Sequence, residues 1–180
     1  MLLAIDTATK HASLALDDGA DILAEHSWRS ANNHTVELAP QVEHMLRNAG
    51  VRADALEALA VALGPGSFTG LRIGLAFAKG FALAHALPLL GVPTLDIVAH
   101  AQPPLDGVLL AVLSAGRGRV AAGVYRWSEA GWQADGPARI TTWDELLRDG
   151  EAGAVYVCGE IDAAARETLG EKVSFATPPL

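Results

Sequence analysis

Residues 63–74 read Leu63-Gly64-Pro65-Gly66-Ser67-Phe68-Thr69-Gly70-Leu71-Arg72-Ile73-Gly74, and a run of small and apolar residues follows to about Ala86. The apolar run 58–63 precedes this stretch and is typical of a short buried strand. The Gly-Pro-Gly triplet ends that strand. Ser67 is a candidate N-cap, because its hydroxyl can accept a hydrogen bond from an amide in the first helical turn. The stretch predicts a strand, a tight turn and a helix.

The predicted helix carries a row of small residues at every fourth position. The members of this row are Gly70, Gly74, Ala78, Ala82 and Ala86. Ile73, Phe77 and Phe81 lie on a different face and are expected to point to the core. A row without bulk lets another backbone approach closely. Two interpretations follow: packing against another helix of the same domain, or an interface with helices of a partner protein.

Two other interpretations of this stretch are weaker. Amides at a helix N-terminus attract anions, which suggests a phosphate-binding loop. The Walker pattern, however, ends in Gly-Lys-Ser/Thr, and here residues 69–71 are Thr-Gly-Leu. The third glycine also comes one residue too late for the Gly-x-Gly-x-x-Gly fingerprint. A membrane-spanning helix is not expected, because Lys79, His85 and Pro88 interrupt the apolar run.

Composition limits the class of protein. The 180 residues are 51% apolar, which is ample for a folded core. The net charge of −8 argues against this chain alone gripping a nucleic-acid backbone, although a partner can supply positive charge. Cys158 is the only cysteine, which excludes an internal disulfide and fits a reducing compartment. The N-terminal residues do not resemble a secretory signal, so a cytoplasmic protein is expected.

The order of elements predicts two halves with one plan. Each half shows three strands, a helix, a strand, a helix and a strand, which is typical of a mixed α/β sheet. We expect the domains to span residues 1–100 and 101–180. The strands expected in the first half are 2–5, 12–16, 22–28, 58–63 and 87–92, and those in the second half are 108–113, 119–127, 131–140, 154–158 and 173–175.

The chain resembles the bacterial TsaB (YeaZ) family over residues 1–98. The motifs that carry the resemblance are the glycine-rich stretch 63–74, residues 4–9 (Ala-Ile-Asp-Thr-Ala-Thr), His34-Thr35, Pro40 and residues 91–95 (Gly-Val-Pro-Thr-Leu). The resemblance implies an α/β fold of two actin-like (ribonuclease H-like) domains, each with a mixed β-sheet flanked by helices, and a shortened second domain.

The resemblance also implies a function. Members of this family are non-catalytic scaffold subunits in the formation of threonylcarbamoyladenosine beside the tRNA anticodon. The paralogue TsaD holds the active site, TsaE is an ATPase partner, and tRNA is reached through the complex. A homodimer is expected when the partner is absent. No cofactor is firmly implied, and ATP or ADP at the junction of the complex is left open. The implied interface residues are His34, Gly66, Ser67, Phe68, Thr69, Gly70, Arg72, Gly74, Ala78 and Ala82.

Nucleotide binding is the alternative for the first strand end. Asp6, Thr7 and Thr9 lie where the actin-like fold places its first phosphate loop, so they are candidate phosphate-binding residues. They also suit a turn in which polar side chains bond to the local backbone. In the second half the chain departs from the family, with Ser114-Ala115-Gly116 in place of Asp-Ala-Arg and Arg119 in place of Glu. Nucleotide hydrolysis is therefore not expected, and weak binding stays open.

Metal-dependent proteolysis, suggested by the old glycoprotease label of the family, is the second alternative. It needs two histidines spaced i, i+4 on one helix face. His34 and His44 lie ten residues apart, and we expect neither a metal site nor catalytic residues in this chain. The sequence thus leaves two function classes, an interaction subunit and an enzyme (a weak nucleotide hydrolase or a metalloprotease), and favours the first.

Overall fold

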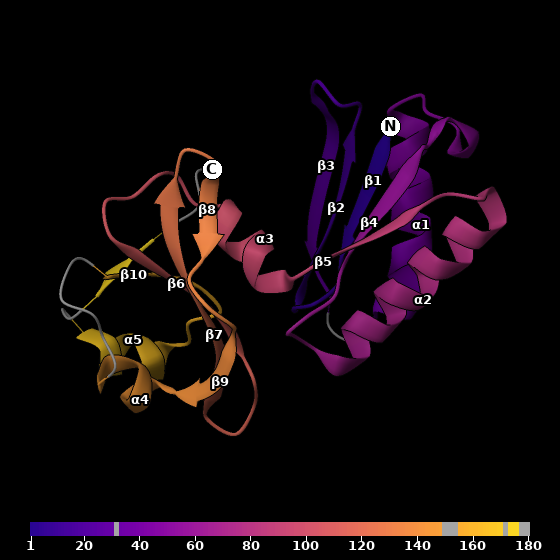
Figure 1. Ribbon diagram of the computed structural model, residues 1–180. Coiled ribbons are helices and arrows are strands. Elements are labelled where there is room, and N and C mark those ends of the chain that lie inside the picture. Colours follow the sequence, from indigo (N-terminus) through magenta and orange to yellow (C-terminus); the bar gives the residue numbers. More distant parts are fainter. Residues whose placement is uncertain (31–32, 149–154, 171–172, 177–180) are drawn as a thin grey trace. The chain divides into compact units, whose positions relative to one another are not determined.

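The computed structural model describes residues 1–30, 33–148, 155–170 and 173–176. The chain divides into two compact units, Met1–Pro93 and Thr94–Leu180 (Figure 1). The division falls at the start of the short helix α3 (Thr94–His100), whereas the sequence suggested a boundary after this helix.

Unit 1 contains one five-stranded mixed sheet in the order β3-β2-β1-β4-β5. The strands are β1 (Leu2–Asp6), β2 (His11–Asp17), β3 (Ile22–Arg29), β4 (Ala58–Ala62) and β5 (Leu89–Val92). The first three are antiparallel neighbours, as the two predicted hairpins require, and β4 and β5 join in parallel. Alternate residues of β1 and β2 are buried, so one face of this sheet is strongly apolar.

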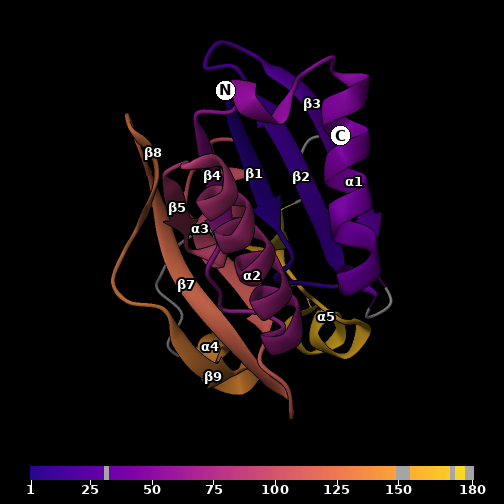
Figure 2. The ribbon, with the colours of Figure 1, turned by 90° about the vertical axis from the view of Figure 1, so that its right-hand side faces the viewer.

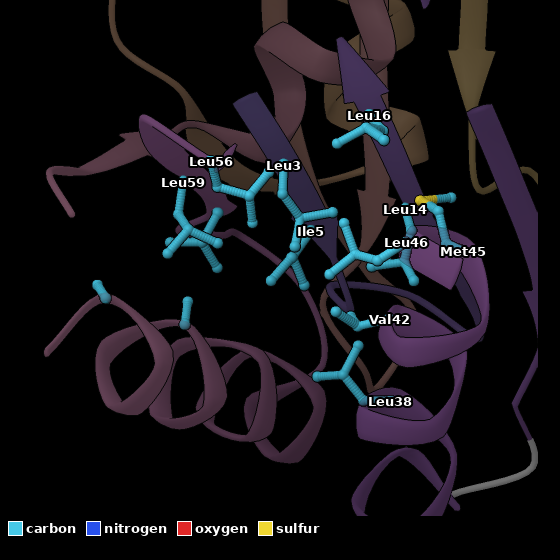
Figure 3. Packing of buried hydrophobic residues seen from close by; sticks show 13 residues of the cluster. Leu3, Ile5, Leu14, Leu16, Leu38, Val42, Met45, Leu46, Leu56 and Leu59 are labelled. Carbon is cyan, nitrogen blue, oxygen red and sulfur yellow. The ribbon is translucent and has the colours of Figure 1, made fainter. Parts of the chain in front are cut away.

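Two helices cover that apolar face, α1 (His34–Asn48) and α2 (Phe68–His85), and a 3-10 turn, η1 (Ala53–Ala55), leads into β4. Figures 1 and 2 show α1 and α2 together on the same side of the sheet. Figure 3 shows the core between these layers, with Leu3 and Leu59 of the sheet and Leu38 of α1. Ala78 of α2 belongs to the same cluster. The two helices of unit 1 are therefore held by their inward faces.

Unit 2 repeats the same strand order. Its elements after α3 are β6 (Val108–Ser114), β7 (Arg119–Ser128), β8 (Gly131–Ala134), β9 (Arg139–Thr142), α4 (Trp143–Arg148), β10 (Val155–Gly159), α5 (Ala163–Leu169) and β11 (Ser174–Phe175). The sheet runs β11-β10-β6-β7-β8, with β6 and β7 antiparallel and β6, β10 and β11 parallel. The central strand of each unit thus pairs with an antiparallel hairpin on one side and parallel strands on the other, which confirms the predicted duplication.

One predicted strand is wrong. The sequence suggested a continuous strand over residues 131–140, but the structure has two strands, β8 and β9. β8 pairs with one half of β7 and β9 with the other half. Gly136, with a φ of +96°, and Pro137 lie between them, and this pair breaks a strand because proline lacks an amide donor.

Helix α3 belongs to unit 2 through its packing. Leu95 and Ala99 are buried in the core of that unit. The Trp132 indole donates a hydrogen bond to the Gln102 carbonyl (3.1 Å), and the Tyr125 hydroxyl donates to the Asp96 carboxylate (2.6 Å). These contacts place the helix with the sequence that follows it. Among the described residues, no helix is long and apolar enough to cross a membrane.

Candidate functional site: the glycine loop and helix α2

The glycine loop, residues 63–70, joins β4 to α2 as the sequence predicted. Ser67 caps the helix, its hydroxyl accepting a hydrogen bond from the Gly70 amide (3.2 Å). The Ser67 amide donates to the Ala8 carbonyl (2.6 Å), so the loop is bound to the turn that follows β1. Gly66 has a φ of +156°, and a Cβ there would overlap with the Ala8 carbonyl oxygen. Only glycine allows this close approach of the two turns.

Thr7 joins β1 to the first turns of α2. Its side chain is 1% exposed, and its hydroxyl donates a hydrogen bond to the Gly70 carbonyl (2.8 Å). A Cβ at Gly70 would overlap with the Thr7 carbonyl oxygen, and a Cβ at Gly74 would overlap with the Thr7 hydroxyl oxygen. The absence of side chains at these two positions therefore lets the helix lie directly on the end of β1.

This packing corrects the predicted interface. Gly70, Gly74, Ala78 and Ala82 are all buried on the side of α2 that faces the sheet. Ala78 and Ala82 belong to the same hydrophobic core as Leu59. A partner cannot touch this row while unit 1 is folded. The row serves internal packing, and the neighbour that it approaches is the sheet, where the sequence analysis considered another helix.

The opposite side of α2 is open, and we call it the outer face of α2. It contains seven exposed residues: Phe68, Thr69, Arg72, Ala76, Lys79, Gly80 and Leu83. Leu83 is 85% exposed and Phe68 is 68% exposed. The Arg72 guanidinium lies 3.9 Å from the centre of the Phe68 ring. A Cβ at Gly80 would meet no atom within 4 Å. The outer face thus combines exposed apolar and small residues with two positive charges, those of Arg72 and Lys79, and these side chains are accessible within the described part of the chain.

Sequence reasoning placed three residues of this face, Phe68, Thr69 and Arg72, in the interface, and it missed Ala76, Lys79, Gly80 and Leu83. A signal for two of them was present, because Ala76 and Gly80 are also small residues spaced by four. Ile73, Phe77 and Phe81 are half-buried and pack at the edge of the core, as predicted. Gly66 is half-buried against Ala8, and Ser67 is exposed.

His34, predicted at the partner interface, lies inside unit 1. It is the first residue of α1 and only 5% exposed, and its Nδ1 has no hydrogen-bond partner among the described residues. Nearby, the Glu37 carboxylate accepts a hydrogen bond from the Trp28 indole (3.0 Å). Side-chain hydrogen bonds lower the pKa of Glu37, and the bond from Ser30 has a larger effect than the bond from Trp28. In this conformation His34 is buried within unit 1, and its place at a partner interface stays a prediction.

The candidate phosphate-binding residues mostly serve the local structure. The Thr7 hydroxyl is buried and bonded to Gly70, so it is closed to phosphate. The Thr9 hydroxyl donates to the His11 carbonyl and accepts from the His11 amide. The Asp6 carboxylate accepts a hydrogen bond from the Ala8 amide (2.7 Å), and burial raises the pKa of Asp6. These bonds are those of a strand-ending turn, which was the alternative interpretation of this segment.

Neither the cysteine nor a metal site points to catalysis in the described residues. Cys158 is 1% exposed, and burial raises the pKa of its thiol to about 12, so it stays protonated and unreactive at neutral pH. Within the ranges that the structure describes, no group of three His, Cys, Asp or Glu side chains is placed to hold a metal ion.

Known proteins resemble this chain in sequence. Residues 23–178 match the family model described as TsaD, tRNA N6-adenosine threonylcarbamoyltransferase. The chain is 29% identical to the tRNA threonylcarbamoyladenosine biosynthesis protein TsaB of Bacillus subtilis over 159 residues, 87% of this chain and 69% of that protein. It is 39% identical to Escherichia coli TsaB over 132 residues, 72% of this chain and 57% of that protein.

Solved structures of known proteins have a similar fold. YeaZ from Pseudomonas aeruginosa superposes with a TM-score of 0.78 at 28% identity, covering 88% of this chain and 75% of that one. The ethanolamine utilization protein EutJ from Carboxydothermus hydrogenoformans shares the fold, with a TM-score of 0.56 at 14% identity, 99% of this chain and 85% of that one. The predicted fold of two actin-like domains with mixed sheets is confirmed. By its sequence and its structure, the chain belongs to the TsaB (YeaZ) family.

Proposed function

We propose that this chain is a non-catalytic subunit in the formation of threonylcarbamoyladenosine on tRNA, and that it docks a TsaD-type paralogue through the outer face of α2. The family supports the process, because the relatives are named for this biosynthesis and the matching family model describes the transferase. The observation that carries the docking surface is the exposure of two large apolar side chains, Phe68 and Leu83, on either side of the open position Gly80.

The shape of this face suits another helix. Ala76 and Gly80 carry little or no side chain in the middle of the face. Because the distance between two packed helices depends on the side chains at their contact, a partner helix could approach closely there. Leu83 stands at one end as an apolar anchor, and Phe68 with Arg72 stands at the other. The adjacent helix α1 also exposes Val36, which is 69% accessible. A helical partner would cover apolar surface that water contacts in the free chain.

The same face would serve a second copy of the chain when the paralogue is absent. A two-fold pair of α2 helices presents the same patch on both sides and needs no further surface. In this proposal the homodimer and the heterodimer exclude each other. A TsaE-type ATPase then joins the heterodimer, with ATP or ADP at the junction, in the cytoplasm where tRNA is modified.

The assignment of catalysis to the partner rests on the turn after β1. Two of its three candidate phosphate ligands are Thr7 and Thr9. Their hydroxyls donate hydrogen bonds to backbone carbonyls of this chain. A nucleotide at this turn would have to break the Thr7 bond that holds α2 in place.

The test is reconstitution. Modification of tRNA by the TsaD-type and TsaE-type partners, supplied with the activated threonylcarbamoyl donor, is measured with and without this chain. The proposal predicts modified adenosine only when the chain is present. An equal rate without the chain would overturn the role, and modification by the chain alone would make it the catalyst.

A further inference from the structure

The turn that joins β6 to β7 concentrates positive charge on an acidic protein. Residues 114–119 read Ser-Ala-Gly-Arg-Gly-Arg, in a chain with a net charge of −8. Arg117 and Arg119 are both exposed. Neither guanidinium has a hydrogen bond or an ion pair within the part of the chain that the structure describes. By contrast, Arg47, Arg52 and Arg126 are paired with Glu43, Asp54 and Asp135.

The backbone of the turn presents Arg117 at its tip. Gly116, Arg117 and Gly118 have φ values of +70°, +56° and +72°. The left-handed conformation costs a residue with a side chain about 1–2 kcal/mol. Hydrogen bonds from the Ala115 amide to the Arg119 carbonyl (2.9 Å) and from the Arg119 amide to the Gly116 carbonyl (3.1 Å) close the turn. The strained geometry is therefore held by the hairpin itself.

The surroundings of the turn are open. A Cβ at Gly116 or Gly118 would meet no atom within 4 Å, so no bulk flanks Arg117 on either side. At the base of the turn the Glu160 carboxylate accepts a hydrogen bond from the Ser114 amide (3.0 Å) and fixes the end of β6. Arg119 lies opposite Thr142 of β9, one diagonal step from Ile140, which is 64% exposed. A large ligand could reach both arginines together.

We propose that this turn contacts the phosphate backbone of the tRNA on which the complex acts, an inference that rests on the proposed function above. A guanidinium binds phosphate with two parallel hydrogen bonds, and the bare glycines let a nucleic-acid backbone come close. Two arginines alone cannot overcome the repulsion between RNA phosphates and a chain with a net charge of −8. The turn therefore adds to an affinity that the partner supplies, and it orients this subunit on the RNA.

The experiment compares the assembled complex with wild-type chain, with R117A/R119A, and with the matched control R47A/R52A, which lowers the net charge by the same two units. Assembly with the TsaD-type partner is measured by sedimentation. Affinity for unmodified tRNA is measured by fluorescence anisotropy at several salt concentrations. Each lost phosphate contact lowers the slope of log affinity against log salt by roughly 0.7–0.9.

The expected result is intact assembly with R117A/R119A, an affinity for tRNA at least about tenfold weaker at 0.1 M salt, and a slope lower by about 1.5. The control should keep wild-type affinity. Equal affinities for both variants would overturn the inference and leave the proposed function untouched. Weaker assembly with unchanged tRNA binding would identify a protein contact and also overturn it. If the wild-type chain does not assemble with its partner, the proposed function fails first and this inference with it.

Discussion

The Thr7 hydroxyl lies directly against Gly74, where a Cβ would overlap with its oxygen, and it donates a hydrogen bond of 2.8 Å to the Gly70 carbonyl. This contact joins the first strand of unit 1 to a helix more than sixty residues later in the chain. It decides which side of α2 is buried. It also removes Thr7 from the groups that could bind a phosphate.

The first prediction follows from the two glycines of α2. Gly74→Ala should lower the free energy of unfolding by up to about 2 kcal/mol, because overpacking costs about 1–3 kcal/mol and the gain in helix propensity offsets about 1 kcal/mol of that. Gly80→Ala, on the open outer face, should raise it by about 0.5–1 kcal/mol. Urea unfolding of both variants measures the difference. A change of the same sign in both would contradict the packing of Gly74 on Thr7.

Thr7 and Gly74 should also be energetically coupled. Thr7→Ala removes the oxygen that a Cβ at position 74 would meet, so it should relieve part of the strain of Gly74→Ala. The double variant is expected to be more stable than the sum of the single changes predicts, by about 1 kcal/mol. A double-mutant cycle measured by urea unfolding gives this coupling energy. Strict additivity would show that the two residues do not touch.

Asp6 should make unit 1 less stable as the pH rises. Burial raises the pKa of Asp6 above 3.8 in the folded chain, so the folded state binds a proton more readily than the unfolded one. The stability from this group is full below the unfolded pKa and is lost as the pH rises through the folded pKa. Asp6→Asn should therefore be more stable than wild type at pH 7, and the gain should shrink toward pH 4.

Asp18 provides a control with the opposite sign. Hydrogen bonds from the Asp21 and Ala20 amides lower the pKa of Asp18. Asp18→Asn should therefore gain no stability at neutral pH, and its unfolding free energy relative to wild type should rise as the pH falls. Parallel pH profiles for the two variants would refute the effect of burial on Asp6.

The single thiol should be inert in the folded chain. With a pKa of about 12 against an ordinary 9.0, Cys158 should react with a thiol reagent at pH 8 roughly a thousandfold more slowly than in the unfolded chain, before its 1% exposure is considered. The release of chromophore from a disulfide reagent, with and without urea, measures both rates. Complete reaction of the native protein within minutes would show that β10 is not packed as described.

The sequence was sufficient for the elements and their order. Hydrophobic period and turn residues placed nearly every strand and helix, because the alternation in β1 and β2 and the cap at Ser67 are local signals. The break between β8 and β9 was also signalled locally, by Gly136 and Pro137, but the alternation on either side outweighed it. The duplication could be predicted because residues 2–92 and 108–175 show a similar succession of strand and helix signals.

The choice of face on α2 could not be predicted. This helix is apolar or small almost all round, and rows spaced by four occur on two sides of it, one with Gly74 and one with Gly80. The buried side packs on the sheet and on Thr7, residues that are distant in sequence from this helix, so no periodic signal in the helix identifies it. The burial of His34 could not be predicted for a similar reason, because it depends on packing inside unit 1.

The central claim is that the outer face of α2 docks the TsaD-type partner. The most direct test is the dissociation constant of that complex, measured by calorimetry for the wild-type chain, for Leu83→Arg, and for the control Ile22→Arg on the edge strand β3, where the side chain is 62% exposed. Both substitutions replace an exposed apolar side chain, so both variants should stay folded. We predict that Leu83→Arg weakens binding by more than about tenfold, or about 1.4 kcal/mol, while Ile22→Arg binds as wild type does. Equal affinities for all three proteins would contradict the account.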